Sequence, residues 1–342
     1  AGSTNPPRSS AAFLGCRSYP FIQGNNSVKH GPNILTDKDV DWSIDFYTKL
    51  NRYIVIKGWM YSPDRLLSKL FLRDIMGNVV EATRINLYYP SAQVAPDIGF
   101  EIDYLFDELF IPSFSLKAVF DDGSTFFLTS GEAEQRFLKR NPANKLIEKF
   151  MSLIEPDEFK TVLDLGSRAR SGRNCRGYFP TKKYIGLDIM EGENVDIVGD
   201  AHNLSKYVPS GSIDVLYSNA VFEHLFMPWK IALEMNKIMR PGGLALIQTH
   251  QMLGMHDMPW DFWRFSGDAW SALFNEKTGF RIIDKVLAYE MVPIPFYYLD
   301  KWKDVESSAG FAESVVLVER TGDSQLSWDV QLDEVISNFY PE

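Results

Sequence analysis

The sequence predicts an α/β domain built on a mostly parallel sheet, preceded by a small antiparallel β domain. Three short apolar runs, at residues 161–165, 184–189 and 195–201, each end in a carboxylate or a glycine turn. Apolar runs of this length suit strands that a parallel sheet buries on both faces. Residues 41–130 instead hold several short β-rich segments and turn signals, which is typical of an antiparallel sandwich.

Length and composition favour two folded domains. The chain has 342 residues, of which 45% are hydrophobic and 14% aromatic, enough for two packed cores. We expect a linker or extended arm over residues 1–40, a β-rich accessory domain over 41–130 and the α/β domain over 131–342. The net charge is −10 and no long block of Lys or Arg is present, which disfavours a nucleic-acid partner.

The cysteines and the apolar runs bear on the compartment. Cys16 and Cys175 lie far apart and form no disulfide or metal-binding spacing. No apolar run approaches the roughly 20 residues of a membrane helix, and the start does not resemble a signal peptide. We therefore expect a cytoplasmic protein without a transmembrane segment.

In the β-rich region, residues 53–59, 69–73 and 78–82 read as strands, and residues 115–120 and 124–128 flank an Asp-Asp-Gly turn that predicts a hairpin. The aromatic residues Trp59, Tyr88 and Tyr89 allow two interpretations. They either stack on sugar rings at the surface or belong to the core, and the core is the commoner place for such residues.

A charged, helix-prone connector over residues 131–140 leads to a new helix. Asn141 followed by Pro142 is a helix start, with Asn as the N-cap and Pro in the first turn. Its apolar residues recur at helical spacing: Leu146, Ile147, Phe150, Met151 and Ile154. This helix is expected to cover one face of the sheet that begins at residue 162.

The next segment indicates a nucleoside ligand. Asp188 follows Gly166 by roughly 20 residues, where nucleotide-binding α/β units place an acid that bridges ribose hydroxyls. The G-x-G-x-x-G pattern of dinucleotide sites is absent, and Arg168 and Arg170 stand where small residues would be needed. Asp164 would repel a phosphate but suits a cation, so we expect a positively charged nucleoside.

Five motifs in the right order resemble class I S-adenosylmethionine-dependent methyltransferases. They are Asp164-Leu-Gly166, Asp188, and residues 199–204, 213–225 and 240–243, within a resemblance that covers roughly residues 141–322. The glycine-poor Gly-Ser-Arg turn is similar to a type-11-like subgroup. The resemblance implies a Rossmann-like, doubly wound sheet of seven strands and S-adenosylmethionine as cofactor. The cofactor-binding residues that it implies are Asp164, Gly166, Ser167, Arg168, Asp188, Ile189, Asp200, Ala201, His202 and Asn219.

The remaining elements complete this sheet. Residues 229–239 predict a helix, 244–249 the fifth strand and 268–274 a short helix. Residues 281–288 and 314–319 are expected to form an antiparallel pair at the sheet edge, separated by an aromatic insertion. The tail from residue 328 has the pattern of a short amphipathic helix.

Three segments should meet at the carboxyl ends of the strands, where such sheets bind ligands: residues 166–172, 219–225 and 250–264. A hydroxyl acceptor requires a general base, and His256 with Asp257 is the first candidate. His250 is a further candidate that could line the pocket. His224 could serve as a base or orient its turn, and Glu223-His224 resembles a pair found after the fourth strand in these enzymes.

The same loop supplies candidate substrate contacts. Trp260, Trp263 and Arg264 could bind a sugar by stacking and hydrogen bonding. In the alternative interpretation the rings cap the sheet and Arg264 pairs with a structural carboxylate. The histidines show no H-x-x-x-H spacing, so we expect no metal.

We therefore hypothesise an S-adenosylmethionine-dependent methyltransferase that O-methylates a saccharide hydroxyl in surface polysaccharide or glycan biosynthesis, alongside other glycan-assembly enzymes. One alternative is a small-molecule, natural-product methyltransferase. Another is a non-catalytic cofactor-binding scaffold in a glycan-assembly complex, which the arginines of the first loop suggest.

Overall fold

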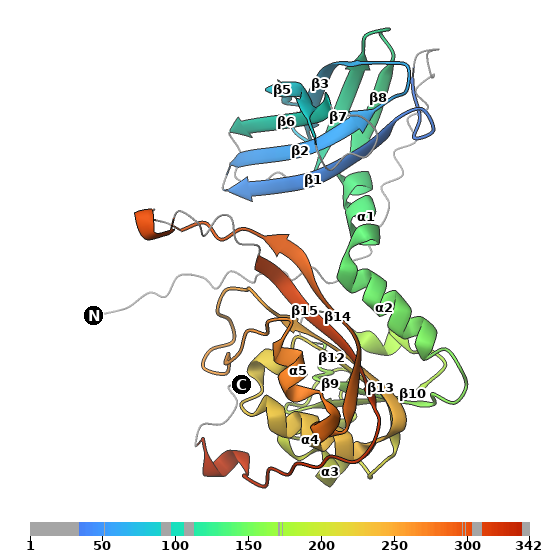
Figure 1. Ribbon diagram of the computed structural model, residues 1–342, viewed down its shortest axis with the longest axis vertical. Coiled ribbons are helices and arrows are strands. Elements are labelled where there is room, and N and C mark those ends of the chain that lie inside the picture. The colour runs from blue at the N-terminus through green and yellow to red at the C-terminus, as the bar shows by residue number, and fades with distance from the viewer. Residues whose placement is uncertain are drawn as a thin grey trace. The chain divides into compact units, whose positions relative to one another are not determined.

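The computed structural model describes residues 34–50, 52–89, 97–105, 113–169, 172, 174–295, 297, 299–302 and 310–336. Cys16, His30, Arg170 and the 1–33 part of the expected arm lie outside the described residues. The chain forms two compact units, one ending at Arg140 and the other beginning at Asn141 (Figure 1). Each unit is described by itself.

The first unit contains two antiparallel sheets of four strands, in the orders β1-β2-β6-β5 and β4-β3-β7-β8. The strands are β1 (Asp41–Leu50), β2 (Tyr53–Tyr61), β3 (Leu67–Asp74), β4 (Val79–Glu81), β5 (Arg84–Tyr88), β6 (Asp97–Leu105), β7 (Phe114–Phe120) and β8 (Thr125–Thr129). Buried residues alternate along β7, and one apolar cluster takes Ile56 and Phe100 from the first sheet and Leu72 and Leu116 from the second. The pairing of β7 with β8 confirms the predicted hairpin.

The aromatic residues of this unit divide between core and surface. Trp59 is 8% exposed, so of the two interpretations the core is the one that applies to it. Tyr88 is 71% exposed, so its ring remains available for stacking on a sugar. Helix α1 (Ser130–Arg140) closes the unit, where the Arg136 guanidinium lies 4.6 Å from the centre of the Trp42 ring.

The second unit is organised around a seven-stranded sheet in the order β11-β10-β9-β12-β13-β15-β14 (Figure 1). Its strands are β9 (Thr161–Leu165), β10 (Lys183–Asp188), β11 (Ile197–Val198), β12 (Ile213–Asn219), β13 (Met239–His250), β14 (Phe280–Met291) and β15 (Gly310–Arg320). The strands from β11 to β13 are parallel, whereas β15 runs antiparallel to both β13 and β14. The predicted mostly parallel seven-stranded sheet and its antiparallel edge pair are confirmed.

Helices and short 3₁₀ turns connect the strands. The helices are α2 (Pro142–Leu153), α3 (Leu204–Tyr207), α4 (Pro228–Ile238) and α5 (Ala269–Leu273). The 3₁₀ turns are Cys175–Tyr178, Ala201–Asn203, Phe222–His224, Glu276–Thr278, Asp300–Trp302 and Leu332–Glu334. Asn141 caps α2 by accepting a hydrogen bond from the amide of Ala143, as its sequence predicts. None of the described helices has both the length and the apolar character that crossing a membrane requires.

The sheet is buried on both faces, which explains its continuous apolar strands. On one face Phe150 of α2 shares a cluster with Val162, Leu246 and Leu317, which confirms that α2 covers this face. On the other face a cluster takes residues from the same strands and from α3, α4 and α5: Leu163, Ala245, Val316, Leu204, Ile231 and Trp270. Successive residues of each strand therefore enter opposite clusters.

Two expected elements are shorter than predicted. The third apolar run forms only the two-residue strand β11. In the tail, the described residues form a 3₁₀ turn at Leu332–Glu334 where an amphipathic α-helix was expected, and Phe339 lies outside the described residues.

Candidate active site

The turn after β9 requires a glycine. Gly166 has a φ of +80°, and its amide donates a hydrogen bond of 2.8 Å to the carbonyl of Leu187. A Cβ at this position would lie 2.1 Å from Cγ2 of Val221. The turn after β9 is therefore in direct contact with the segment after β12, which confirms the expected meeting of these two segments.

Asp188 ends β10 beside this turn. Its Oδ2 accepts the amide of Arg168 at 3.2 Å, and its Oδ1 accepts the amide of Met190 at 3.0 Å. A carboxylate oxygen has capacity for a second hydrogen bond, so both oxygens can still accept a hydroxyl. The Arg168 Nε lies 3.9 Å from Oδ1. The first loop thus places a guanidinium next to the predicted ribose-binding acid, while Arg170 is outside the described residues.

Asp164 is buried and hydrogen-bonded to the hydroxyl of Tyr184. Asn194 Nδ2 donates to that hydroxyl at 2.7 Å and to the carbonyl of Ser167 at 3.0 Å. Burial and the neighbouring Asp164 charge raise the pKa of Tyr184, so its hydroxyl remains a donor at neutral pH. Asp164 therefore stabilises the turn through this chain of hydrogen bonds.

Asp200 and His202 join two loops. Asp200 Oδ1 accepts the amide of His202 at 2.9 Å and lies 2.7 Å from its Nδ1, while His202 Nε2 accepts the amide of Met227 at 3.2 Å. These partners assign the ring proton to Nδ1. Burial raises the pKa of Asp200, but the hydrogen bonds that it accepts from the ring and the backbone amide of His202 outweigh this effect, and the net pKa is lowered. His202 is thus a buried structural histidine.

The other predicted cofactor residues differ in exposure. Ala201 is buried, Ile189 is 37% exposed and Asn219 ends β12. Ser167 Oγ is buried and has no hydrogen-bond partner among the described residues. The Ser167 hydroxyl packs against Gly186, where an added Cβ would lie 2.6 Å from its Oγ.

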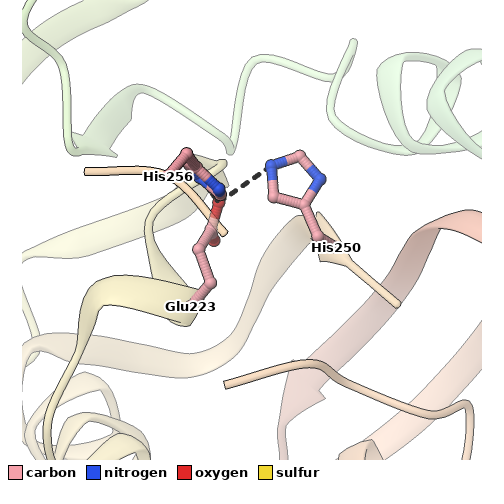
Figure 2. A group of neighbouring side chains, drawn as sticks. All are labelled: Glu223, His250 and His256. Carbon is pink, nitrogen blue, oxygen red and sulfur yellow. Dashed lines mark ion pairs between the residues drawn. The ribbon is translucent and has the colours of Figure 1, made fainter. Parts of the chain in front are cut away.

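Glu223 lies at the centre of a histidine cluster, which we define as Glu223, His224, His250 and His256. Glu223 is fully buried, and its Oε2 accepts the hydroxyl of Thr249. Its Oε1 lies 3.0 Å from Nε2 of His250 and 3.9 Å from Nε2 of His256 (Figure 2). Nε2 of His224 lies 3.8 Å from the same oxygen. Burial raises the pKa of Glu223, but the His250 and His224 interactions outweigh it, so its pKa is below the ordinary value.

Backbone carbonyls orient two of these imidazoles. His224 Nδ1 lies 2.6 Å from the carbonyl of Trp260, and His256 Nδ1 lies 3.1 Å from the carbonyl of Gly254. A carbonyl oxygen only accepts, so each Nδ1 carries a proton. Both rings consequently direct Nε2 toward Glu223 Oε1.

The segment after β13 is fastened to this cluster by its backbone. The carbonyl of Glu223 accepts the amides of Phe262 and Trp263 at 2.8 and 3.1 Å, and the carbonyl of His250 accepts the amide of Phe265 at 2.8 Å. The predicted convergence of the segments after β12 and β13 is confirmed.

Arg264 forms a bidentate ion pair with Asp261, at 2.6 and 2.8 Å. The hydrogen bonds from Arg264 lower the pKa of Asp261 to about 2. The Asp261 carboxylate also accepts the amide of His256 at 2.9 Å. Arg264 thus has the structural carboxylate partner that the second interpretation of the sequence named.

The tryptophans of the segment differ. Trp260 is 3% exposed and packs against Phe262, so it offers no open face. Trp263 is 37% exposed, with its ring 6.1 Å from that of Trp229, which in turn lies 5.8 Å from Trp328. We call Trp229, Trp263 and Trp328 the tryptophan cluster.

The sequence analysis did not assign Glu223, Thr249 or Asp261. The one available signal was the Glu223-His224 pair, which was interpreted through its histidine alone. Asp257, predicted beside His256, lies with its Oδ2 3.9 Å from Nε2 of His224.

A parallel sheet with a glycine turn after one strand and an acid at the end of the next is the arrangement with which many α/β domains bind a nucleoside cofactor. A family model described as a methyltransferase domain matches residues 133–284. Residues 133–284 are therefore similar to a methyltransferase domain, and the cofactor that such a domain uses is S-adenosylmethionine.

One curated protein and two solved structures are similar to parts of this chain. An uncharacterized methyltransferase of Mycolicibacterium gilvum is 43% identical over 110 residues, which are 28% of this chain and 40% of that protein. The matched segment thus spans less than half of the curated relative. Two solved structures cover about half of this chain. A putative S-adenosylmethionine-dependent methyltransferase of Listeria monocytogenes is 14% identical with a TM-score of 0.35, covering 51% of this chain and 96% of that one. A putative methyltransferase of Bacillus halodurans is 13% identical with a TM-score of 0.38, covering 52% and 99%.

Proposed function

We propose that this protein is an S-adenosylmethionine-dependent methyltransferase that O-methylates a hydroxyl group of a saccharide. The observation that carries the proposal is the convergence of three imidazoles on buried Glu223, within 3.9 Å, beside the segment that contacts the cofactor turn. A hydroxyl acceptor must lose its proton as the new bond forms, and an imidazole nitrogen with a lone pair can accept that proton.

The cofactor supplies a methyl group on a positively charged sulfur, which leaves as a neutral thioether. Asp188 is the residue that would hold the ribose, and the Gly166 turn allows close approach of the backbone. His256 and His224 would take the acceptor proton at Nε2, and Glu223 would stabilise the resulting imidazolium. Positioning of the two reactants supplies most of the remaining rate enhancement.

A saccharide acceptor is supported by the tryptophan cluster. Its rings are 37–43% exposed, and the flat faces of such rings stack on sugars. We further propose that the N-terminal unit, as a sandwich of its two sheets, presents a polymeric substrate, and that the protein acts in cytoplasmic steps of surface polysaccharide biosynthesis with other glycan-assembly enzymes.

The test is calorimetric titration of S-adenosylhomocysteine into the wild type, Asp188→Asn and Asp196→Asn. Asp196 is a matched control because it also accepts a backbone amide, that of Gly186 at 2.8 Å. Loss of one charged hydrogen bond, about 1.5–3 kcal/mol, predicts about 10- to 100-fold weaker binding for Asp188→Asn. Binding by neither wild type nor variants would instead favour the scaffold.

The acceptor class is tested with labelled S-adenosylmethionine and two panels, one of oligosaccharides and one of small phenols and quinones. Methylation of the saccharides, reduced by Trp263→Ala, is expected. Methylation confined to the phenols and quinones would favour the small-molecule alternative.

A further inference from the structure

Two imidazoles and a carboxylate meet at one point in the second unit. Glu223 comes from the 3₁₀ turn after β12, His250 is the last residue of β13, and His256 lies in the following loop (Figure 2). One ligand atom from each of these three residues lies within 4.8 Å of the others. Only the assembled sheet brings them together, because they are separated by 27 and 6 positions in the sequence.

The donor atoms of the cluster suit a cation. His256 directs Nδ1 toward the carbonyl of Gly254, which leaves Nε2 as the ring nitrogen that can bind an ion, and the Glu223 carboxylate offers acceptor oxygens. An ion between His256 Nε2 and Glu223 Oε1, which lie 3.9 Å apart, would be bound by both groups. Donation of the second ring nitrogen's proton to a carbonyl is also how metal-ligating histidines are held.

The distances fit a small divalent ion. Ligands about 2.0–2.2 Å from zinc lie roughly 3–3.6 Å from one another. The separation of His250 Nε2 from Glu223 Oε1 is 3.0 Å, and the 3.9 Å of His256 requires a shift of less than about 1 Å. The His256 side chain is 20% exposed and lies in a loop, so its ring has room to adjust.

We propose that Glu223, His250 and His256 bind one divalent transition-metal ion of the zinc type. Two imidazoles and one carboxylate favour zinc, iron(II) or cobalt(II) over magnesium and calcium, which take oxygen ligands. Three protein ligands leave a coordination position open, as in catalytic rather than structural zinc sites.

The ion would give the site a specific use, and this part rests on the proposed function. An acceptor hydroxyl bound at the open position loses its proton more readily, because the ion stabilises the developing negative charge. Because the ion would occupy Nε2 of His256, His256 could not act as the base while the ion is bound, and His224, which is not a ligand and lies 3.9 Å from Asp257, would receive the proton in its place.

The test uses the full-length chain, free of any histidine tag and dialysed against a chelator. ZnCl₂ and MgCl₂ are titrated calorimetrically, and CoCl₂ is followed by its visible absorption. The variants are Glu223→Gln and His256→Gln, with Glu234→Gln as a matched control. Glu234 is a buried glutamate elsewhere in the unit, bound by Ser205 and Lys237.

The wild type and Glu234→Gln should bind one equivalent of zinc, at least 100-fold more tightly than magnesium. Since even residues behind metal ligands change affinity by 10- to 100-fold, we expect about 100-fold weaker zinc binding in Glu223→Gln and His256→Gln. Circular dichroism checks that each variant is folded. Zinc affinity that is equal in all four proteins, or no better than magnesium affinity in the wild type, overturns the metal site.

S-Adenosylhomocysteine is titrated in parallel without metal. Binding of this ligand without zinc binding leaves the proposed function intact and rejects the metal site. Zinc binding without nucleoside binding rejects the proposed function and keeps the metal site.

Discussion

Replacement of Gly166 by alanine tests the cofactor turn most directly. An L-residue in the left-handed region costs roughly 1–2 kcal/mol. The new Cβ would also lie 2.1 Å from Val221 Cγ2, and overpacking of this kind costs about 1–3 kcal/mol. The expected loss in the free energy of unfolding is therefore about 2–5 kcal/mol, a large part of the roughly 5–15 kcal/mol of a typical domain.

Gly211 provides a matched control. It has a φ of +64°, its amide donates to the carbonyl of Lys237 at 3.1 Å, and no described atom lies within 4 Å of its would-be Cβ. Gly211→Ala should show the conformational cost alone, about 1–2 kcal/mol. The difference between the two variants measures the contact with Val221.

Urea denaturation followed by circular dichroism gives both free energies, and Val221→Ala completes a double-mutant cycle. Removal of the Val221 methyl groups should offset about 1–3 kcal/mol of the Gly166→Ala loss. Equal destabilisation by Gly166→Ala and Gly211→Ala, with additive effects in the cycle, would refute the close contact between the two turns.

Three further predictions concern the second unit. The pKa of Asp261 is about 2, below the ordinary 3.8, so its ionised form stabilises the fold above pH 4 and that contribution, about 2 kcal/mol, is lost as the pH falls toward 2. Acid denaturation of Asp261→Asn should lack this part of the pH dependence. Asn236 makes three side-chain hydrogen bonds to backbone groups, so Asn236→Ala should cost about 3 kcal/mol in urea denaturation, and a loss below 1 kcal/mol would contradict this. Trp270→Phe leaves the buried Ser314 hydroxyl without its 2.7 Å donor and should lower stability by about 1–3 kcal/mol, whereas Trp270→Phe with Ser314→Ala should recover part of the loss.

The sheet was predictable because a strand that is buried on both faces is apolar at consecutive positions of the sequence. The runs at Val162 and Val215 are continuous and apolar since neighbouring residues enter opposite clusters. The helix α2 was equally predictable, from its N-cap residue and from the helical spacing of its apolar residues. By contrast, the sequence left both the core and the surface open for Trp59, because adjacent residues of its strand, Trp59 and Met60, are both buried and no simple alternation marks one face.

The histidine cluster was not predictable as a unit. A search for short spacing detects ligands on one helix face, whereas Glu223 and His250 meet because they lie at the carboxyl ends of the neighbouring parallel strands β12 and β13. Their contact depends on strand order, which the sequence does not state. The sequence also left open whether Arg264 binds substrate or pairs with a carboxylate. Its partner Asp261 is only three residues away, but the conformation of the whole loop decides whether the two side chains meet.

The backbone bonds of Glu223 and His250 have a consequence for how such a protein can diversify. Residues 251–261 form a loop that begins after His250. The loop is closed by the backbone hydrogen bonds from Phe262 and Trp263 to Glu223 and from Phe265 to His250. The entropy cost of lengthening a closed loop grows only logarithmically, by roughly 0.6 kcal/mol per doubling. Within this loop Met255 is 81% exposed, whereas Trp260 is buried and Asp261 is held by Arg264. Added residues should therefore be tolerated next to Met255 and not around Trp260 and Asp261.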